Sequence, residues 1–424
     1  MKAILGGALA LALVSESAAV AACTAKVVGN DFVIDGCNLV VRNGSGSTST
    51  VNGLGNVIIG YDAPNTVDGF PKGKTGSHNL VVGDEHSYTS SGGVVTGFQN
   101  AVAGPSANVL GGRLNRSTGP YANVTGGQYG QAVGGSSMVL GGWANEARAN
   151  FTTATGGSYN TATSSSGDPF AASYSVVVGG TGSTASGTGA AVIASLGSTA
   201  NGEGSLVVGG TGSEASGTGA TTVASLGTLA SGEGALAVGG AGSTASGPGA
   251  AVVASLGSTP RAARASLVVA GIGSEASGAG ATVVASLGSI ASGEGSLAVG
   301  GSSNQAQDGA LICGGNENVG SGDVAMFNGD ANTATGAFAT VVGGYHNNVT
   351  GQWATVSGGY ENLASGDWSS VSGGLDNTAS ADHATVSGGE LNEADWYAST
   401  VSGGAQVNTP DSTSSWAAGT YHSP

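Results

Sequence analysis

The stretch WATVSGGYENLASGD (residues 353–367) recurs with small changes throughout the C-terminal part of the chain. Near copies of its ATVSGG phrase end every fifteen residues, at Gly344, Gly359, Gly374, Gly389 and Gly404. A single fixed period requires every copy to fill the same structural role, whereas a catalytic pocket is assembled from unlike segments. The repeat therefore predicts an architecture before it predicts any chemistry.

The same Gly–Gly step, or a small residue in its place, extends the period to most of the chain. It recurs every 14–16 residues from Gly83 to Gly403, apart from one longer interval between Gly156 and Gly179. Fifteen residues are too few for a pair of helices but fit two short strands and two turns. Within residues 353–367, ATVSG is strand-like and ENLASGD is rich in turn residues. The sequence predicts an all-β fold, a parallel β-solenoid of about 22 coils over residues 76–409.

Asparagine marks one turn of these repeats, three or four residues after the Gly–Gly step. Its side chain can satisfy backbone groups at a turn and stack amide on amide between coils. We therefore predict a structural ladder here and not a ligand site. The column contains Asn100, Asn115, Asn145, Asn160, Asn304, Asn318, Asn332, Asn347, Asn362, Asn377 and Asn392.

Composition excludes several partners. The chain has 424 residues with 81 Gly, 8% charged residues and a formal net charge of −16. So few charges are atypical of a disordered chain, which points to order by stacking of coils. Only ten Lys and Arg are present, without a basic cluster, so neither nucleic acid nor an anionic membrane surface is an expected partner.

The N-terminal sequence MKAILGGALALALVSESAAVAAC has the layout of a secretory signal, which we place at residues 1–22. It predicts a secreted or cell-surface protein with no transmembrane segment in the mature chain. Export to an oxidising compartment predicts a Cys23–Cys37 disulfide, with lipidation of Cys23 as the alternative. Residues 23–75 are expected to form an N-terminal β cap and residues 410–424 a C-terminal tail. Cys313 is expected to be a small buried strand residue.

Several middle repeats are apolar on both faces of their strand. Aligning SLVVG on ATVSG places Leu206 and Val208 where the C-terminal repeats have Thr355 and Ser357. A thin coil has one interior, so the second apolar face must meet another surface. A trimer interface is the natural use, although a dimer or a lateral partner satisfies the same physics. The expected interface residues are Leu206, Val208, Leu236, Val238, Leu297 and Val299.

Catalytic patterns are weak. The five His residues have no zinc-type spacing, and the GxG at Gly210 lacks the rest of a dinucleotide motif. We expect no enzyme, no cofactor and no bound metal. Trp353 and Trp368 lie fifteen residues apart and are expected to stack on one edge, where covering the turn is favoured over holding a glycan ring.

SLAVGG at residues 296–301 and GSLVVGG at residues 204–210, followed by turns such as SEASGTG, resemble the head repeats of YadA-like trimeric adhesins. The resemblance implies a left-handed parallel β-roll, three chains side by side, and adhesion at a bacterial surface. The coiled-coil stalk and membrane anchor typical of that family have no counterpart after Gly404, so self-anchoring is not expected.

Two functions remain. The first is a structural or adhesive surface protein that binds surfaces, matrix or glycans through many weak contacts. The second is an ice-binding solenoid, because coils about 4.8 Å apart would align hydroxyl groups into two columns. A polysaccharide-degrading β-helix is disfavoured because no cluster of carboxylates or Arg is apparent. The candidate surface-binding columns contain Thr355, Ser357, Ser370, Ser372, Thr385, Ser387, Thr400 and Ser402.

Overall fold

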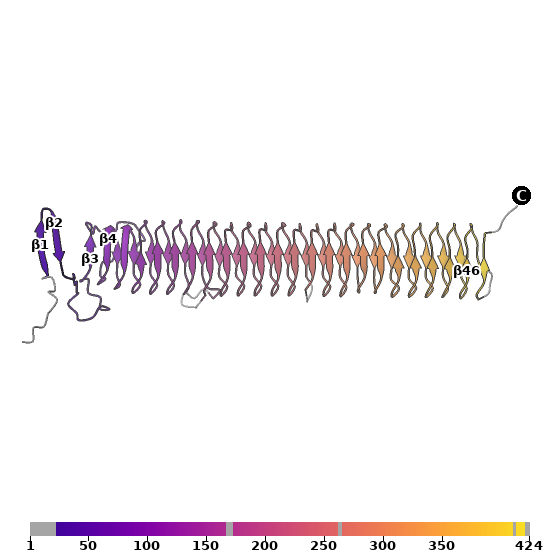
Figure 1. Ribbon diagram of the computed structural model, residues 1–424, viewed down its shortest axis with the longest axis horizontal. Helices are drawn as coiled ribbons and strands as arrows, with labels where there is room; N and C mark the ends of the chain where they lie inside the picture. Colours follow the sequence, from indigo (N-terminus) through magenta and orange to yellow (C-terminus); the bar gives the residue numbers. More distant parts are fainter. Residues whose placement is uncertain (1–22, 167–172, 262–264, 410–412, 420–424) are drawn as a thin grey trace, which may run out of the picture.

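The computed structural model describes residues 23–166, 173–261, 265–409 and 413–419, and these residues form a straight rod (Figure 1). The described residues contain strands and turns but no helix. Consecutive turns stack in parallel with a spacing of about fifteen residues, and there are about 22 of them. The predicted parallel β-solenoid is confirmed. The signal predicted at residues 1–22 lies outside the described residues.

One long sheet runs the length of the rod and takes one strand from each rung. Its typical strand has three residues, of which the middle residue is fully buried and the outer two face outward. This alternation follows from the two-residue period of a strand. Its strands are β3 (Val57–Ile59), β4 (Leu80–Asp84), β6 (Val94–Phe98), β8 (Asn108–Val109), β10 (Asn123–Thr125), β12 (Met138–Leu140), β14 (Thr153–Thr155), β16 (Val176–Val178), β18 (Ala191–Ile193), β20 (Leu206–Val208), β22 (Thr221–Val223), β24 (Leu236–Val238), β26 (Ala251–Val253), β28 (Leu267–Val269), β30 (Thr282–Val284), β32 (Leu297–Val299), β34 (Leu311–Cys313), β36 (Ala325–Phe327), β38 (Thr340–Val341), β40 (Thr355–Val356), β42 (Ser370–Val371), β44 (Thr385–Val386), β46 (Thr400–Val401) and β47 (Trp416–Ala417).

The opposite side of the rod is built from two-residue strands in an 11-stranded and a 10-stranded sheet. The break between them falls at Pro260, which has no N–H to donate. The first of these sheets contains β5 (Ser87–Tyr88), β7 (Ala101–Val102), β9 (Arg116–Ser117), β11 (Gln131–Ala132), β13 (Glu146–Ala147), β15 (Thr161–Ala162), β17 (Thr184–Ala185), β19 (Thr199–Ala200), β21 (Glu214–Ala215), β23 (Leu229–Ala230) and β25 (Thr244–Ala245). The second contains β27 (Thr259–Pro260), β29 (Glu275–Ala276), β31 (Ile290–Ala291), β33 (Gln305–Ala306), β35 (Val319–Gly320), β37 (Thr333–Ala334), β39 (Asn348–Val349), β41 (Leu363–Ala364), β43 (Thr378–Ala379) and β45 (Glu393–Ala394).

The core is a narrow column of small side chains between the two sides. Val207 from the long sheet and Ala215 from the short-strand sheet are both fully buried, and the neighbouring rungs repeat the pattern. Close stacking also explains part of the glycine content. A Cβ on Gly202 would lie 2.1 Å from the carbonyl oxygen of Gly217 in the next rung, so this position excludes every larger residue.

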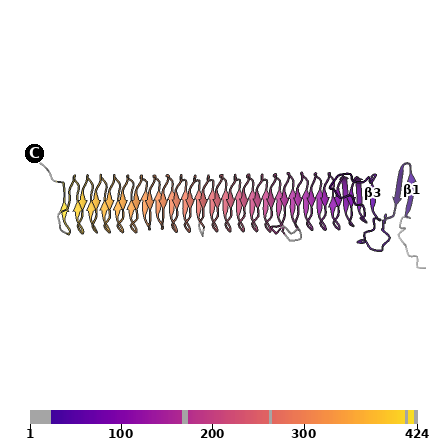
Figure 2. The same ribbon diagram turned by 180° about the vertical axis from the view of Figure 1, so that it is seen from behind.

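The N-terminal end of the rod carries a separate hairpin, which both views show beyond the first rung (Figures 1 and 2). β1 (Thr24–Val28) and β2 (Asp31–Asp35) pair antiparallel, and the Cys23–Cys37 disulfide links the two ends of the hairpin. The predicted disulfide is therefore confirmed. It occupies the sulfur that lipidation of Cys23 would require.

The solenoid extends into both segments that flank the predicted repeats. Val57 of β3 pairs with Leu80 of β4, which places the first rung within residues 23–75. At the other end, Trp416 of β47 pairs with Thr400 of β46, within the segment expected to be a tail. The step from Val57 to Leu80 is longer than any Gly–Gly interval of 14–16 residues, so that spacing did not reveal the first rung. The last rung was missed because no Gly–Gly step follows Trp416.

Candidate binding faces

The asparagine column is an internal hydrogen-bond ladder. Asn362 is almost fully buried, and its Nδ2 donates to the carbonyl oxygens of Gly358 and Gly374 and to Oδ1 of Asn347. Its Oδ1 accepts from the backbone N–H of Asn377, at 3.0 Å. The predicted structural role is confirmed, and a residue so committed offers nothing to a ligand. In the middle repeats Ser takes the same place, as where Ser198 Oγ accepts from the N–H of Ser213.

The outer face of the middle block is apolar, as predicted. We define the middle block as β16 to β34, residues 176–313. Leu206 and Val208 point outward and are half-buried by their neighbours in the stack, while Val207 between them is fully buried. The other four predicted interface residues, Leu236, Val238, Leu297 and Val299, have the same disposition. The single chain therefore presents a long stripe of aliphatic side chains that no described residue covers.

Glycine at one corner leaves this apolar face open. Gly204 lies two residues before β20 with φ of 62°, and a Cβ added there would meet no atom within 4 Å. Trp353 holds the corresponding corner before β40 with φ of 59°. The corner conformation is thus the same in both rungs, but from β18 to β34 the corner holds only Gly or Ala. Aromatic side chains fill it in other rungs, as Phe151, Tyr174 and Trp353 do.

Cys313 does not occupy the buried position that we expected. It is the third residue of β34, lies partly exposed on the outer face, and pairs in register with Val299 of β32. Ile312 is the inward residue of that strand. The phrase ALICGG is apolar throughout, so its sequence alone does not show which residues face inward.

The C-terminal hydroxyl columns form as predicted. Thr355, Ser370 and Thr385 occupy equivalent positions on consecutive rungs, and Thr400 continues the column. The backbone N–H of each serine in the second column donates to a carbonyl oxygen of the next rung and holds the column in register. This column contains Ser357, Ser372, Ser387 and Ser402, all exposed. At the last rung the Trp416 indole N–H donates to Ser402 Oγ at 2.7 Å and closes the end of this column.

Stacked aromatic rings border the hydroxyl columns. Trp353 stacks on Trp368 with ring centroids 5.2 Å apart, which confirms the predicted pairing, and Phe338 stacks on the other side of Trp353 at 4.2 Å. Tyr345 and Tyr360 form a second pair after the strands. Both faces of Trp353 are therefore occupied by neighbouring rings, so it presents its edge to solvent and covers the turn.

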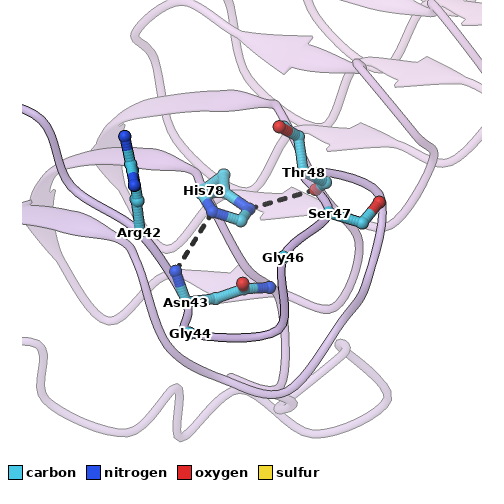
Figure 3. Close-up of a pocket in the computed structure, with 7 residues that line it drawn as sticks. All are labelled: Arg42, Asn43, Gly44, Gly46, Ser47, Thr48 and His78. Carbon is cyan, nitrogen blue, oxygen red and sulfur yellow. Dashed lines mark hydrogen bonds between the residues drawn. The ribbon is translucent and has the colours of Figure 1, made fainter.

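A cleft of about 370 Å³ lies beside the first rungs, where the loop of residues 42–48 surrounds His78 (Figure 3). The Nε2 atom of His78 accepts from the backbone N–H of Asn43 at 3.2 Å, and Nδ1 lies 3.0 Å from the carbonyl oxygen of Thr48, to which it donates. These partners fix the orientation of the ring. Both nitrogens are used by the backbone, so His78 supports the loop and is not arranged as a general base or metal ligand.

A second histidine, His86, is buried and begins the internal ladder. His86 is 1% exposed; its Nε2–H donates to the carbonyl oxygen of Val82, and its Nδ1 accepts from the N–H of Asn100. Burial lowers the pKa of His86 below its usual value. Nearby, burial and the hydrogen bond to Asp62 raise the pKa of Tyr88 to about 12. These groups stabilise the first rungs in fixed protonation states.

Among the described residues, no group of three or more His, Cys, Asp or Glu side chains is placed to hold a metal ion. The described residues also include no helix that is long and apolar enough to cross a membrane. Comparison of the chain with protein-family models and with curated proteins gave no match.

Proposed function

We propose that the protein is an exported, non-enzymatic rod that acts as a structural or adhesive element at a cell surface. The observation that carries the proposal is the unbroken stacking of similar rungs from β3 to β47, so that each stretch of the rod repeats its own outward-facing residues at a fixed spacing. A rigid array of equivalent sites binds by avidity, because each contact holds the next one at high local concentration. The resemblance to YadA-like head repeats and the N-terminal signal pattern support the same role.

The C-terminal hydroxyl columns are the proposed surface-binding face. They place Thr and Ser hydroxyls on consecutive rungs about 4.8 Å apart, and stacked aromatic rings border them. Polysaccharides and matrix proteins present hydroxyl and amide groups that suit such a surface. The middle block is proposed to serve self-association, because its aliphatic stripe is a large apolar surface to leave in water.

Two deletions test the adhesive proposal without changing the repeat register. Removing residues 355–384 joins Ala354 to Thr385 and deletes two rungs of the hydroxyl columns. Removing residues 109–138 joins Asn108 to Val139 and deletes two rungs elsewhere, as the control. Binding to polysaccharide-coated or matrix-coated surfaces is expected to fall about tenfold or more with the first deletion and to persist with the second. No binding by the full chain, or equal losses in both, would contradict the proposal.

Ice binding is the second candidate, favoured by the register of Thr355, Ser370, Thr385 and Thr400. Serine in the neighbouring column lacks the methyl group of threonine and makes the surface less regular, which places this candidate below adhesion. Thermal hysteresis of the purified full chain that disappears with the deletion of residues 355–384 would establish it in place of adhesion.

A further inference from the structure

The outer face of the middle block carries an alternation in side-chain size. We call the first residues of its strands the first column; from β18 to β32, Leu occupies every second rung and Ala or Thr the rungs between. The third residues, which form the third column, are all Val or Ile over the same rungs. In order, the first column contains Ala191, Leu206, Thr221, Leu236, Ala251, Leu267, Thr282 and Leu297.

A column at the Gly–Gly turn beside the third column alternates in the opposite phase. Leu196, Leu226, Leu256 and Leu287 belong to the rungs in which the first column has Ala or Thr, and they are 51–56% exposed. Thr211, Ala241, Ile272 and Ser302 belong to the rungs with Leu in the first column. The stripe is thus a regular series of projections and depressions with a period of two rungs.

Two flat faces can be placed against each other with the chains parallel or antiparallel. With the chains parallel, a two-fold axis along the rod sets the first column against the third at the same level. Leu206 would then face Val208, and one rung further on Thr221 would face Val223. The rungs with Leu would hold the two faces further apart than the rungs with Ala or Thr require, so gaps would remain between the faces at the Ala and Thr rungs. Closely packed interfaces avoid such gaps.

With the chains antiparallel, a two-fold axis along the strands sets the first column against itself in reversed order. Over the eight rungs from Ala191 to Leu297, every Leu then faces an Ala or Thr. Leu236 faces Ala251 of the second copy, and Leu206 faces Thr282 of the second copy. The turn column matches in three of its four pairings, where Leu196 faces Ser302, Leu287 faces Thr211 and Leu256 faces Ala241 of the second copy. The exception is Leu226, which faces Ile272 of the second copy.

We propose that the middle block binds a second copy of this chain face to face and antiparallel, with the two-fold axis between the rungs of Leu236 and Ala251. This inference rests on the proposed use of the middle block for self-association. It differs from the three-chain arrangement that the adhesin resemblance implies, because three flat faces around one axis put equal rungs at equal levels and cannot interleave the Leu side chains.

The available area suits a reversible pair. The overlap runs from β16 to β34, about 45 Å at 4.8 Å per rung, and a three-residue strand is about 10 Å wide. The two copies together would bury about 1,000 Å², near the lower limit for a specific interface. The first and third columns contain no charged residue from β16 to β34, and Gly204 leaves their edge open to a flat partner.

The natural thiol of Cys313 provides a direct test. In the antiparallel pair, Cys313 faces Val178 of the second copy, whereas in a parallel pair it faces Leu311. Facing sheets lie about 10 Å apart, beyond disulfide reach, so a bismaleimide reagent with a two-carbon spacer is used. We expect the Val178→Cys full chain, with its Cys23–Cys37 disulfide intact, to give a cross-linked species of twice the chain mass. The Leu311→Cys variant and the wild type are expected to give none.

A size swap provides a second measurement. Leu236→Ala and Ala251→Leu are each expected to raise the dissociation constant of the dimer about tenfold or more. The double variant is expected to return to a dissociation constant within about threefold of the wild type. Sedimentation gives the dissociation constants, and circular dichroism confirms the fold of each variant. Cross-linking by Leu311→Cys, a trimer mass, a monomeric wild type, or a double variant no better than the singles would overturn the antiparallel pair. Because no adhesive target is needed, these results are independent of surface binding.

Discussion

Replacing Asn362 by Ala is expected to open the C-terminal rungs locally, because the ladder has no substitute for its side chain. The variant loses the acceptor for the backbone N–H of Asn377, a fully buried group with no other hydrogen-bond partner among the described residues. It also removes the donor to the carbonyl oxygen of Gly358. The carbonyl oxygen of Gly374 keeps its bond from the N–H of Tyr360, and Nδ2 of Asn377 keeps its bonds to Gly373 and Gly389.

The cost therefore comes mainly from one orphaned buried N–H and one half-buried carbonyl. Each unsatisfied buried group costs about 1–3 kcal/mol, so Asn362→Ala is expected to destabilise this region by about 2–4 kcal/mol. Asn362→Ser is the matched control, because a Ser hydroxyl accepts the equivalent N–H in the middle repeats, as Ser198 does from Ser213. We expect about 1 kcal/mol for this variant.

Hydrogen exchange at the Thr378 amide measures the difference. Its bond to the carbonyl oxygen of Asn392 is untouched by either substitution, so its exchange rate reports local opening. The Ala variant is expected to exchange about 30-fold to 1,000-fold faster than the wild type, since each 1.4 kcal/mol is tenfold. Equal rates in the Ala and Ser variants would refute the account of the ladder as the stabilising element.

Three further substitutions probe other parts of the rod. Thr222→Val is expected to stabilise the middle block by about 1–3 kcal/mol, measured by denaturant midpoint, because the buried Thr222 hydroxyl has no partner. The first rungs are expected to lose stability as pH falls below about 6.5, because the pKa of His86 is lowered in the folded chain and the unfolded chain therefore binds the proton first. Faster hydrogen exchange at the Asn100 amide would detect this loss, and His86→Asn should remove the pH dependence. Trp353→Ala is expected to lower the stability by about 1–3 kcal/mol, because two ring stacks are lost. Trp353→Gly is expected to cost less, because glycine adopts a φ of 59° without strain, and thermal unfolding compares the two variants.

Much of this architecture was readable from the sequence because a period of fifteen residues leaves few folds. Aligning SLVVG on ATVSG placed Val207 inside and Leu206 outside, and the spacing of Trp353 and Trp368 predicted their stack. Prediction failed where the local pattern is ambiguous. Cys313 lies in a wholly apolar phrase, and a long loop between Ile59 and Leu80 separates the first rung from the second.

The sequence also did not predict that Ser or Thr replaces Asn in the middle ladder, or that His86 takes this place at its start. Ser198 and His86 each supply an acceptor to the next N–H, as Asn does, although the side chains differ in shape. The backbone need is therefore constant, whereas the residue that meets it varies. The role of an outward face depends on what covers it, and no periodicity within one chain specifies that partner.

Whether the middle block is a contact surface at all is tested by adding charge to it. The triple variant Leu206→Asp, Leu236→Asp and Leu297→Asp places three carboxylates on the first column. Leu206 and Leu236 lie two rungs apart, about 10 Å, where the repulsion in water is only about 0.4 kcal/mol, so the single chain should still fold.

Burying the same carboxylates unpaired between two copies costs several kcal/mol each, so light scattering is expected to show the single-chain mass. The matched triple variant at Thr355, Thr385 and Thr400 places two of its carboxylates on adjacent rungs, where self-repulsion is stronger, about 1 kcal/mol. It should nevertheless keep the mass of the wild type, because those positions are expected to face water. Since this experiment is blind to chain direction, a middle-block variant that keeps its mass, or a wild type that is already a single chain, removes self-association itself and with it every arrangement of the copies.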